Sequence, residues 1–214
     1  FLSKLRCFDK TYITDEDKIR GNLYKSESKR TKLKQQLKSL SDWIKTLDLT
    51  IIIENIKNEN TPRAVQLLNK TNQMNLSTRR LNEREFNKWV QEDKNNLWTI
   101  RAADKFGDYG IVGIFSISIK DNVATLVDFI LSCRVVGRYI EETMIEFLKE
   151  FCYENNVNKI KGKYKKTEKN SLCYYFFNKL KLIDSNQHSF EFSSNQKKSN
   201  LLNIKVKKPT MEKK

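Results

Sequence analysis

The chain has 214 residues, of which 38% are hydrophobic and 31% charged, and its formal net charge is +15 at pH 7. This composition is typical of a domain with a buried core, and no run approaches the ~18 apolar residues of a membrane-spanning helix. The first segment, Phe1–Tyr12, carries charges throughout and does not resemble a secretory signal, so we expect a cytoplasmic protein.

Four cysteines and one histidine restrict the chemistry. The cysteines are widely spaced without a C-x-x-C pair, which indicates reduced thiols. Because His188 is the single histidine, we expect neither a zinc site nor a Ser–His–Asp arrangement. The net charge fits either a well-solvated surface or an anionic partner, such as nucleic acid, a phosphorylated cofactor or an acidic carrier protein. The cysteines are Cys7, Cys133, Cys152 and Cys173.

The first 47 residues are predicted to be helical. Thr14-Asp15-Glu16-Asp17 is a typical helix start, with a threonine cap and acidic residues in the first turn. This helix is expected to run to about Leu40, and a short helix with the cap Ser41-Asp42 is expected to end at Leu47. The first helix has a thin apolar stripe, so we expect it to dock on another body or to bridge two domains.

Residues 49–103 predict alternating strands and helices. Pro62 is placed at an early helical position, and Asn82 is a good helix cap. The predicted elements are a strand at 49–53, a helix at 60–72, an extended piece at 76–81, a helix at 82–90 and a strand at 97–103.

Two apolar runs then predict a hairpin, 111–119 and 123–131, which a loop with Gly137 in its bend connects to a long helix. From Ile140 to Cys152, apolar residues recur at helical spacing. Four charged residues are expected on the solvent face of this helix: Glu141, Glu142, Glu146 and Lys149.

The last part of the chain predicts short elements: strands at 159–165, 190–192 and 202–206, a helix at 170–180 and a basic, frayed tail at 207–214. From residue 49 the order is β-α-α-β-β-β-α-β-α-β-β. This order predicts an α+β layered fold with a mostly antiparallel central sheet flanked by helices.

The loop 132–139 joins a buried strand to a helix N-terminus, where backbone amides lack internal partners and attract anions. With Arg134 and Arg138 on either side of Gly137, it predicts a cradle for phosphate or pyrophosphate. The alternative is an ordinary strand–helix connection with a turn glycine.

The spacing Arg134-x-x-Gly137-x-Tyr139 resembles the pyrophosphate-binding signature of GNAT acyltransferases, R/Q-x-x-G-x-G/A, except that Tyr139 replaces a small residue. The predicted element order is also the GNAT order. The resemblance implies a GNAT-like fold that binds coenzyme A or phosphopantetheine. Its implied cofactor-binding residues are Arg134, Val135, Val136, Gly137, Arg138, Tyr139 and Asn170, the last by contact with the pantetheine arm.

The same resemblance places a tyrosine seven residues after Asn170, as the acid that protonates the leaving thiolate. This chain has Phe177 there. Tyr174 or Tyr175 can substitute for it, although aromatic residues on this helix also suit the core.

Three polar blocks, 69–80, 104–113 and 131–138, resemble the C-terminal half of FkbH-like proteins of HAD-superfamily subfamily IIIC. Members of that family load a glyceryl unit onto an acyl carrier protein. The resemblance therefore implies a carrier protein as partner and an HAD-like domain on the N-terminal side. The implied division is a helical junction at 1–47, a GNAT-like acyltransferase domain at 48–206 and a basic tail at 207–214.

Two residues are candidates for catalysis. Cys133, next to Arg134 and near a helix N-terminus, has its thiolate favoured and can hold an acyl group in transit. The alternative is a small buried residue that packs a strand end. Asp128 interrupts an apolar strand and is either a base or the partner of an arginine.

Two groups of polar residues are candidates for binding. A dense cluster between two helices predicts a site for a small hydroxylated acyl group, or else a set of caps on a solvated turn. Its members are Asn72, Gln73, Asn75, Arg79 and Arg80. A lysine ridge is expected to meet phosphates or an acidic carrier protein, or to be a solvated strand face. It comprises Lys159, Lys161, Lys163, Lys165, Lys166 and Lys169.

Three functions follow. The first is a GNAT-type acyltransferase that uses a phosphopantetheine thioester of coenzyme A or acyl carrier protein. The second is a non-catalytic module that docks an acidic carrier protein for a partner domain. The third, nucleic-acid binding, rests on charge alone, because Tyr164 is the only aromatic residue in the lysine ridge.

Overall fold

The computed structural model describes residues 15–37, 39–180, 189–195 and 204–211. An eight-stranded sheet forms its centre, and five of the seven strand pairings are antiparallel. From edge to edge the strands are β7 (Ser189–Ser193), β6 (Lys159–Lys163), β5 (Val123–Leu131), β4 (Gly107–Lys120), β3 (Asn95–Asp104), β1 (Thr50–Asn55) and β8 (Lys205–Lys207). A short strand, β2 (Met74–Asn75), pairs with β5. The predicted α+β fold is confirmed.

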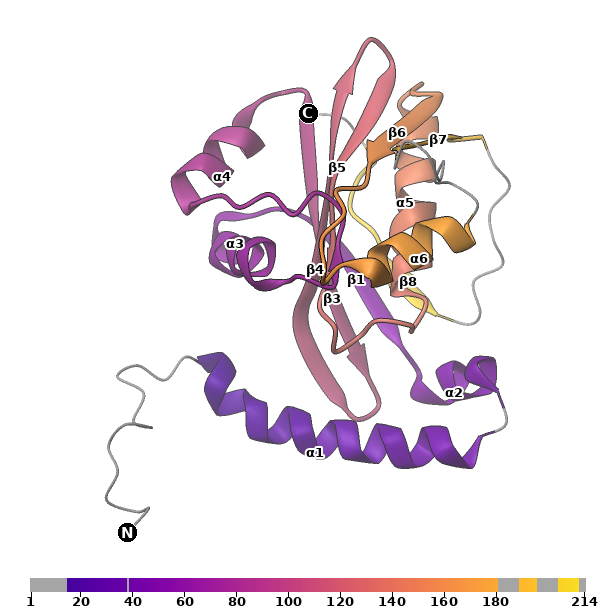
Figure 1. The fold of residues 1–214 in the computed structure, drawn as a ribbon. Coiled ribbons are helices and arrows are strands. Elements are labelled where there is room, and N and C mark those ends of the chain that lie inside the picture. The colour runs from indigo at the N-terminus through magenta and orange to yellow at the C-terminus, as the bar shows by residue number, and fades with distance from the viewer. Residues whose placement is uncertain (1–14, 38, 181–188, 196–203, 212–214) are drawn as a thin grey trace.

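Helices cover both faces of this sheet. One face carries α3 (Thr61–Lys70), which follows the short 3-10 turn η3 (Asn58–Asn60), and α4 (Glu83–Gln91), and the other carries α5 (Ile140–Glu154) and α6 (Ser171–Lys179) (Figure 1). The first two helices, α1 (Asp15–Gln36) and α2 (Leu40–Leu47), lie across one end of the sheet (Figure 1). No helix in the described part of the chain is long and apolar enough to cross a membrane.

The core forms because alternating residues of β3, β4 and β5 meet the apolar side of α5. Trp98 stacks on Phe115 at 5.2 Å between ring centroids and meets the rings of Phe147 and Phe151 edge-on. These four aromatic rings are buried, and such arrangements add packing energy beyond area burial. The core thereby fixes α5, and with it the loop before α5, against the sheet.

Element boundaries follow the predictions with local corrections. The cap of α2 is Ser39, whose hydroxyl accepts from the Asp42 amide at 3.1 Å, rather than Ser41-Asp42. The predicted capping residue Asn82 is confirmed, with a reciprocal bond from Glu85. Thr14, the expected cap of the first helix, lies outside the described residues.

The last two strands lie on opposite edges of the sheet. β7 pairs with β6, whereas β8 pairs in parallel with β1, so that Lys207 is the partner of Ile52. The following residues are also held, because Asn155 donates to the Met211 carbonyl and Lys208 pairs with Glu150. The expectation of a frayed tail from residue 207 is therefore wrong for residues 207–211.

A buried ionic network fastens α1 to the sheet. Arg30, 1% exposed, donates from Nε and Nη2 to Asp104, both at 2.7 Å. Tyr109 donates to the same carboxylate at 2.6 Å, and Arg138 donates to the Tyr109 hydroxyl. Arg138 also bonds Glu27 of α1 at 2.9 Å, which closes a ring of contacts between α1 and the loop before α5.

Candidate functional site

The loop 132–139 lies at the carboxyl end of β5 and leads into α5. After α5 the chain returns along β6, which pairs in parallel with β5 and ends its ladder at Leu126 and Gly162. Ligands of open α/β sheets bind at such carboxyl ends, where the amides of the next helix point outward. The predicted strand–loop–helix arrangement is confirmed.

Two residues of the loop take left-handed backbone conformations. Gly137 has φ 77°, which glycine adopts freely, and Tyr139 has φ 61°, which a tyrosine adopts at a cost. Tyr139 is the N-cap of α5 and makes no side-chain capping bond. Its ring packs instead with the α2 cluster around Trp43 and Leu47. The large side chain that departs from the GNAT signature is accommodated there.

Glu141 occupies the anion position that the loop creates. Its Oε1 accepts from the Gly137 amide at 2.7 Å, while its Oε2 is buried without a partner among the described residues. Glu141 is 3% exposed, so its predicted place on the solvent face of α5 is wrong. Burial raises its pKa to about 7, against the opposing effect of the backbone bonds from Gly137 and its own amide.

The two arginines of the loop behave differently. Arg134 is half-buried and bonds the Ser132 hydroxyl at 3.3 Å. Arg138 is 4% exposed and turns its guanidinium toward Glu27, Tyr109 and the Trp43 ring. Its side chain serves the α1 network, so only its backbone is available to a ligand at the loop.

Cys133 lies in the loop, two residues after β5 ends, and its side chain is exposed. The alternative interpretation, a small buried residue that packs a strand end, is therefore wrong. Cys152 is buried on the apolar face of α5 as expected, and Cys173 is buried as well, which raises the pKa of its thiol to about 12. Among the described cysteines, Cys133 alone is accessible to a substrate.

A segment of the chain itself fills the space beside the loop. β2 pairs Met74 with Leu131 and Asn75 with Ile130, and the next amide, of Leu76, donates to the Phe129 carbonyl at 3.2 Å. On its other side, the Leu76 carbonyl accepts from the Lys165 amide at 3.0 Å. Residues 74–76 thus lie between the carboxyl end of β5 and the chain that continues from β6.

Asn170 holds this segment in place. Its Nδ2 donates to the carbonyls of Asn75 and Lys165 at 3.0 and 2.8 Å, and its Oδ1 accepts from the Tyr164 hydroxyl and the Thr167 amide at 2.7 and 2.8 Å. These four bonds use the hydrogen-bonding capacity of the side-chain amide. The predicted contact with a pantetheine arm therefore requires at least one of them to open.

The helix after Asn170 contributes aromatic residues to the core. Phe177 is fully buried and stacks on Phe190 at 4.7 Å. Tyr174 is half-buried beside the Tyr164 ring, and Tyr175 is 65% exposed. Because residue 177 is phenylalanine, this position offers no hydroxyl to protonate a leaving thiolate.

A bulge in β5 sets the second part of the candidate site. Ser116 pairs with Asp128 and Ile117 with Leu126, so Val127 has no partner in the ladder. Asp128 is fully buried, and its carboxylate accepts from Ser116 at 2.6 Å. Such bulges redirect side chains near functional sites.

Arg79 neutralises this buried carboxylate. Its Nε and Nη2 bond the two oxygens of Asp128 at 2.8 and 2.5 Å, and Ser77 donates at 3.1 Å. The interpretation of Asp128 as the partner of an arginine is confirmed. Its four accepted bonds leave no free lone pair for a base, so we assign it a positioning role. The guanidinium of Arg79 stacks on the Trp89 ring, with 4.3 Å between its central carbon and the ring centroid.

The remaining residues of the predicted acyl-binding cluster separate. Arg80 donates to the Leu68 carbonyl in the last turn of α3 and to the side-chain oxygen of Asn72. Asn75 is fully buried and bonds the Thr71 carbonyl at 2.9 Å, whereas Gln73 is exposed. Only Arg79 of this cluster reaches the bulge, and the others form caps and turns.

Part of the lysine ridge lies on β6, at the end of the sheet formed by β5, β6 and β7. Lys161 and Lys163 line a hollow there, and Lys159 pairs with Glu191 at 2.9 Å. The rest of its lining is Thr125, Gly162, Ser189, Phe190 and Glu191. Within the described residues, no group of three or more potential ligands can hold a metal ion.

Comparison with known proteins identifies the fold. No family model matches the chain, and no curated protein matches its sequence. The ribosomal-protein-S18-alanine N-acetyltransferase of Escherichia coli aligns at TM-score 0.50 and 9% identity, over 71% of this chain and 98% of that one. A GNAT-family acetyltransferase of Staphylococcus aureus Mu50 aligns at 0.51 and 11%, over 68% and 99%. The chain has a GNAT fold. A domain from Methanocaldococcus jannaschii aligns at 0.52 and 15%, over 67% and 97%.

These likenesses concern the GNAT fold alone, because unrelated chemistries share folds. The FkbH-like resemblance and its division of the chain stay predictions. Sequence patterns did not indicate Glu141 in the anion position, the serines around Asp128 or the ring of Trp89. The one local signal for Glu141 is its place in the first turn of a helix that has no capping side chain.

Proposed function

We propose that this chain is an acyl-transfer domain of the GNAT type that uses a phosphopantetheine thioester, supplied by coenzyme A or an acyl carrier protein. One observation supports this most strongly: the Gly137 amide at the N-terminus of α5 already holds a carboxylate, that of Glu141, at 2.7 Å. A phosphate oxygen can take the same position when Glu141 turns outward. The backbone of Val135–Tyr139 would then hold the phosphates.

Cys133 is our candidate acyl acceptor in transit. Its thiolate attacks the carbonyl carbon of the donor thioester, a new sulfur–carbon bond forms, and the carbon–sulfur bond to the phosphopantetheine breaks. The leaving thiolate takes up the proton that Cys133 released. Transfer between thiols is nearly isoenergetic, so proximity and an exposed thiol suffice.

The acyl group is expected to lie on the face of the sheet at the β5 bulge. There Asp128 positions Arg79, whose guanidinium rests on Trp89 and is 21% exposed on the side chain. A small hydroxylated group such as a glyceryl unit offers acceptors to the remaining N–H groups of Arg79. The glyceryl unit and the FkbH-like context are proposals that the sequence blocks support.

A second candidate, the non-catalytic docking module, is favoured by the segment 74–76. This segment occupies the space between β5 and the chain after β6, and Asn170 bonds it on the other side. A thioester arm enters there only if the segment moves. A module that binds a carrier protein by its surface alone does not require that movement.

Calorimetry with coenzyme A and intact-mass measurement after incubation with an acyl thioester test the proposal together. We expect binding of coenzyme A and one acyl adduct, which Cys133→Ser removes without loss of binding. Gly137→Asn, which tolerates positive φ, should keep most of the affinity, and Gly137→Val should lose it.

Equal affinity of Gly137→Val and the parent would refute the phosphate cradle. If no adduct forms and Cys133→Ala transfers acyl groups like the parent, the covalent step is wrong and direct transfer remains. If no variant transfers to any acceptor while a carrier protein still binds, the docking module is the function.

A further inference from the structure

The outer face of α6 presents a stripe of large apolar side chains to solvent. Leu172 is 39% and Tyr175 65% exposed, and the half-buried Phe176 lies beside them. Their spacing of three and four residues puts them on one side of the helix. Among the described residues, only Leu40 and Tyr153 are other large apolar side chains with such exposure. Contiguous exposed apolar side chains of this kind mark interaction sites.

Positive charge lies at both ends of this stripe. Lys165, Lys166 and Lys169 are exposed in the segment before α6 and form no salt bridge with any described residue. At the other end, Lys179 is 74% exposed on its side chain and only 3.9 Å from Glu142. Glu168 is the one acidic residue within the first group. Basic side chains therefore outnumber acidic ones at the ends of the stripe.

The contact between Lys179 and Glu142 also fixes where the stripe lies. Glu142 is in the first turn of α5, so the end of α6 adjoins the loop 132–139. A protein that covers α6 would stand next to this loop and to the exposed Cys133. Figure 1 shows α6 on the same side of the sheet as α5.

We propose that the outer face of α6 docks an acidic amphipathic helix of a protein partner. Leu172 and Tyr175 would enter the apolar stripe of that helix, and its acidic residues would meet the lysines at the two ends. A single apolar stripe between charged ends matches the geometry of one helix. A second copy of this chain fits poorly, because two surfaces of the same positive sign repel each other in a molecule of charge +15. The proposal names the partner surface of the proposed function and rests on that function for the carrier protein as probe.

Binding of an acyl carrier protein, in its apo and holo forms, tests the surface. Tyr175→Ser should weaken both forms about tenfold, because exposed tyrosines that become buried are common binding hot spots. Lys166→Gln should weaken binding roughly threefold and reduce its salt dependence. Circular dichroism and thermal unfolding check that both variants keep the fold.

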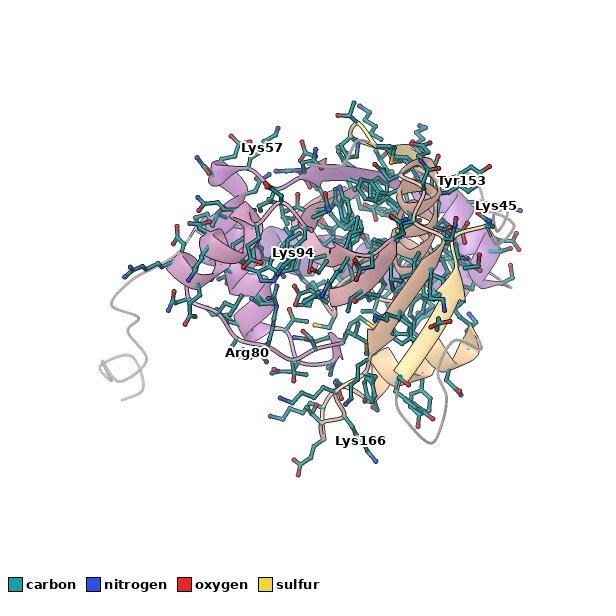
Figure 2. All side chains as sticks on the ribbon, turned by 90° about the horizontal axis from the view of Figure 1, so that it is seen from above. Lys45, Lys57, Arg80, Lys94, Tyr153 and Lys166 are labelled. Atoms are coloured by element: carbon teal, nitrogen blue, oxygen red, sulfur yellow. The ribbon has the colours of Figure 1, made fainter. Side chains whose placement is uncertain are left out.

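The chain offers a matched control for each variant. Tyr153→Ser removes a tyrosine that is 62% exposed on α5, and Lys57→Gln removes a lysine with 57% side-chain exposure. Lys166 projects from one side of the molecule, whereas Lys57 and Tyr153 lie at the opposite side (Figure 2). Neither control should change the affinity.

Each outcome decides between specific alternatives. If coenzyme A binds but Tyr175→Ser and Tyr153→Ser bind the carrier alike, the surface is wrong and the proposed function stands. If the apo carrier binds through Tyr175 while coenzyme A does not bind, the surface stands and the proposed cofactor fails. Loss of self-association in Tyr175→Ser, or binding of anionic vesicles through Tyr175 with no binding of the carrier, would assign the face to a second copy or to a membrane and overturn the proposal.

Discussion

Glu141 is the residue whose protonation should affect stability most directly. Burial raises its pKa to about 7 in the folded chain, whereas a glutamate in an unfolded chain titrates near ~4.3. Between these values the folded state binds more protons than the unfolded state. The free energy of unfolding therefore falls as the pH rises through this window, and it stays at the lower level above it.

Glu141→Gln should remove this penalty. Glutamine keeps an oxygen for the Gly137 amide and carries no charge. We expect equal stability of variant and parent near pH 4 and a gain of about 3 kcal/mol in the variant above pH 7. Urea unfolding across this range measures the difference.

The control for this prediction is Glu154→Gln, an exposed glutamate at the end of the same helix. It should leave the pH profile unchanged. If the free energy of unfolding of Glu141→Gln and of the parent depended on pH in the same way, burial would not raise the pKa of Glu141, and the prediction would be wrong. Glu141→Gln should also change the affinity of the loop for phosphate groups, because a neutral amide then replaces the carboxylate at the Gly137 amide.

At the residue scale, the sequence correctly predicts the turn glycine and the place of Cys152 on the apolar face of α5. Gly137 and Cys152 are recognisable because their roles depend on adjacent residues. The place of Arg138 is not, because its partner Glu27 is 111 positions away. A helical wheel also places Glu141 outward, since it carries no information on the loop that folds over it.

Among the elements, β2 depends on a side chain outside it. Asn170 joins the Asn75 carbonyl of β2 to the Lys165 carbonyl, and both its donors and its acceptor are used. Asn170→Ala should lower the free energy of unfolding by about 3 kcal/mol, because several buried polar groups lose their partners. Asn178→Ala, an exposed position on the same helix, should have no such effect.

Asn170→Ala should also release the segment 74–76. We expect faster amide hydrogen exchange at Leu76, whose bond to the Phe129 carbonyl belongs to this segment. If the segment blocks a thioester arm, Asn170→Ala should also bind coenzyme A more tightly than the parent. Unchanged exchange at Leu76 would mean that Asn170 does not hold the segment.

The elements themselves are largely predictable. β5 and α5 begin where the predictions place them, because strand and helix periods are local properties of the sequence. β2 is only two residues long and is defined by its pairing with β5, so its own pattern does not reveal it. The predicted extended piece at 76–81 is displaced from it for that reason.

For the whole molecule, long-range contacts decide where α1 and β8 lie. The parallel pairing of β8 with β1 and the bond between Arg30 and Asp104 join residues far apart in the sequence. The sequence shows only that α1 has a thin apolar stripe. The helix docks on the sheet mainly through charge, because the buried Arg30 of α1 pairs with the buried carboxylate of Asp104 at the end of β3.

Arg30 of α1, which pairs with Asp104 of the β3–β4 hairpin, should therefore contribute more to stability than Arg101, an exposed arginine of that hairpin. Arg30→Ala leaves Asp104 buried without its main partner, and we expect a loss of about 3–5 kcal/mol in the free energy of unfolding. Arg101→Ala breaks an ion pair with Asp108 whose side chains are 40% and 54% exposed, and it should cost less than about 1 kcal/mol.

The pH dependence distinguishes lost charge pairing from lost packing. Burial alone would raise the pKa of Asp104, but the bonds from Arg30 and Tyr109 outweigh it and hold this pKa below its ordinary value. In the parent, the contribution of Asp104 is thus present above the unfolded pKa of ~3.9 and is lost as the pH falls through the lower folded value. In Arg30→Ala burial prevails, the folded pKa rises, and acidification should recover part of the lost stability. A deficit in Arg30→Ala that stays constant from neutral to acidic pH would assign the effect to packing and leave α1 without an electrostatic anchor.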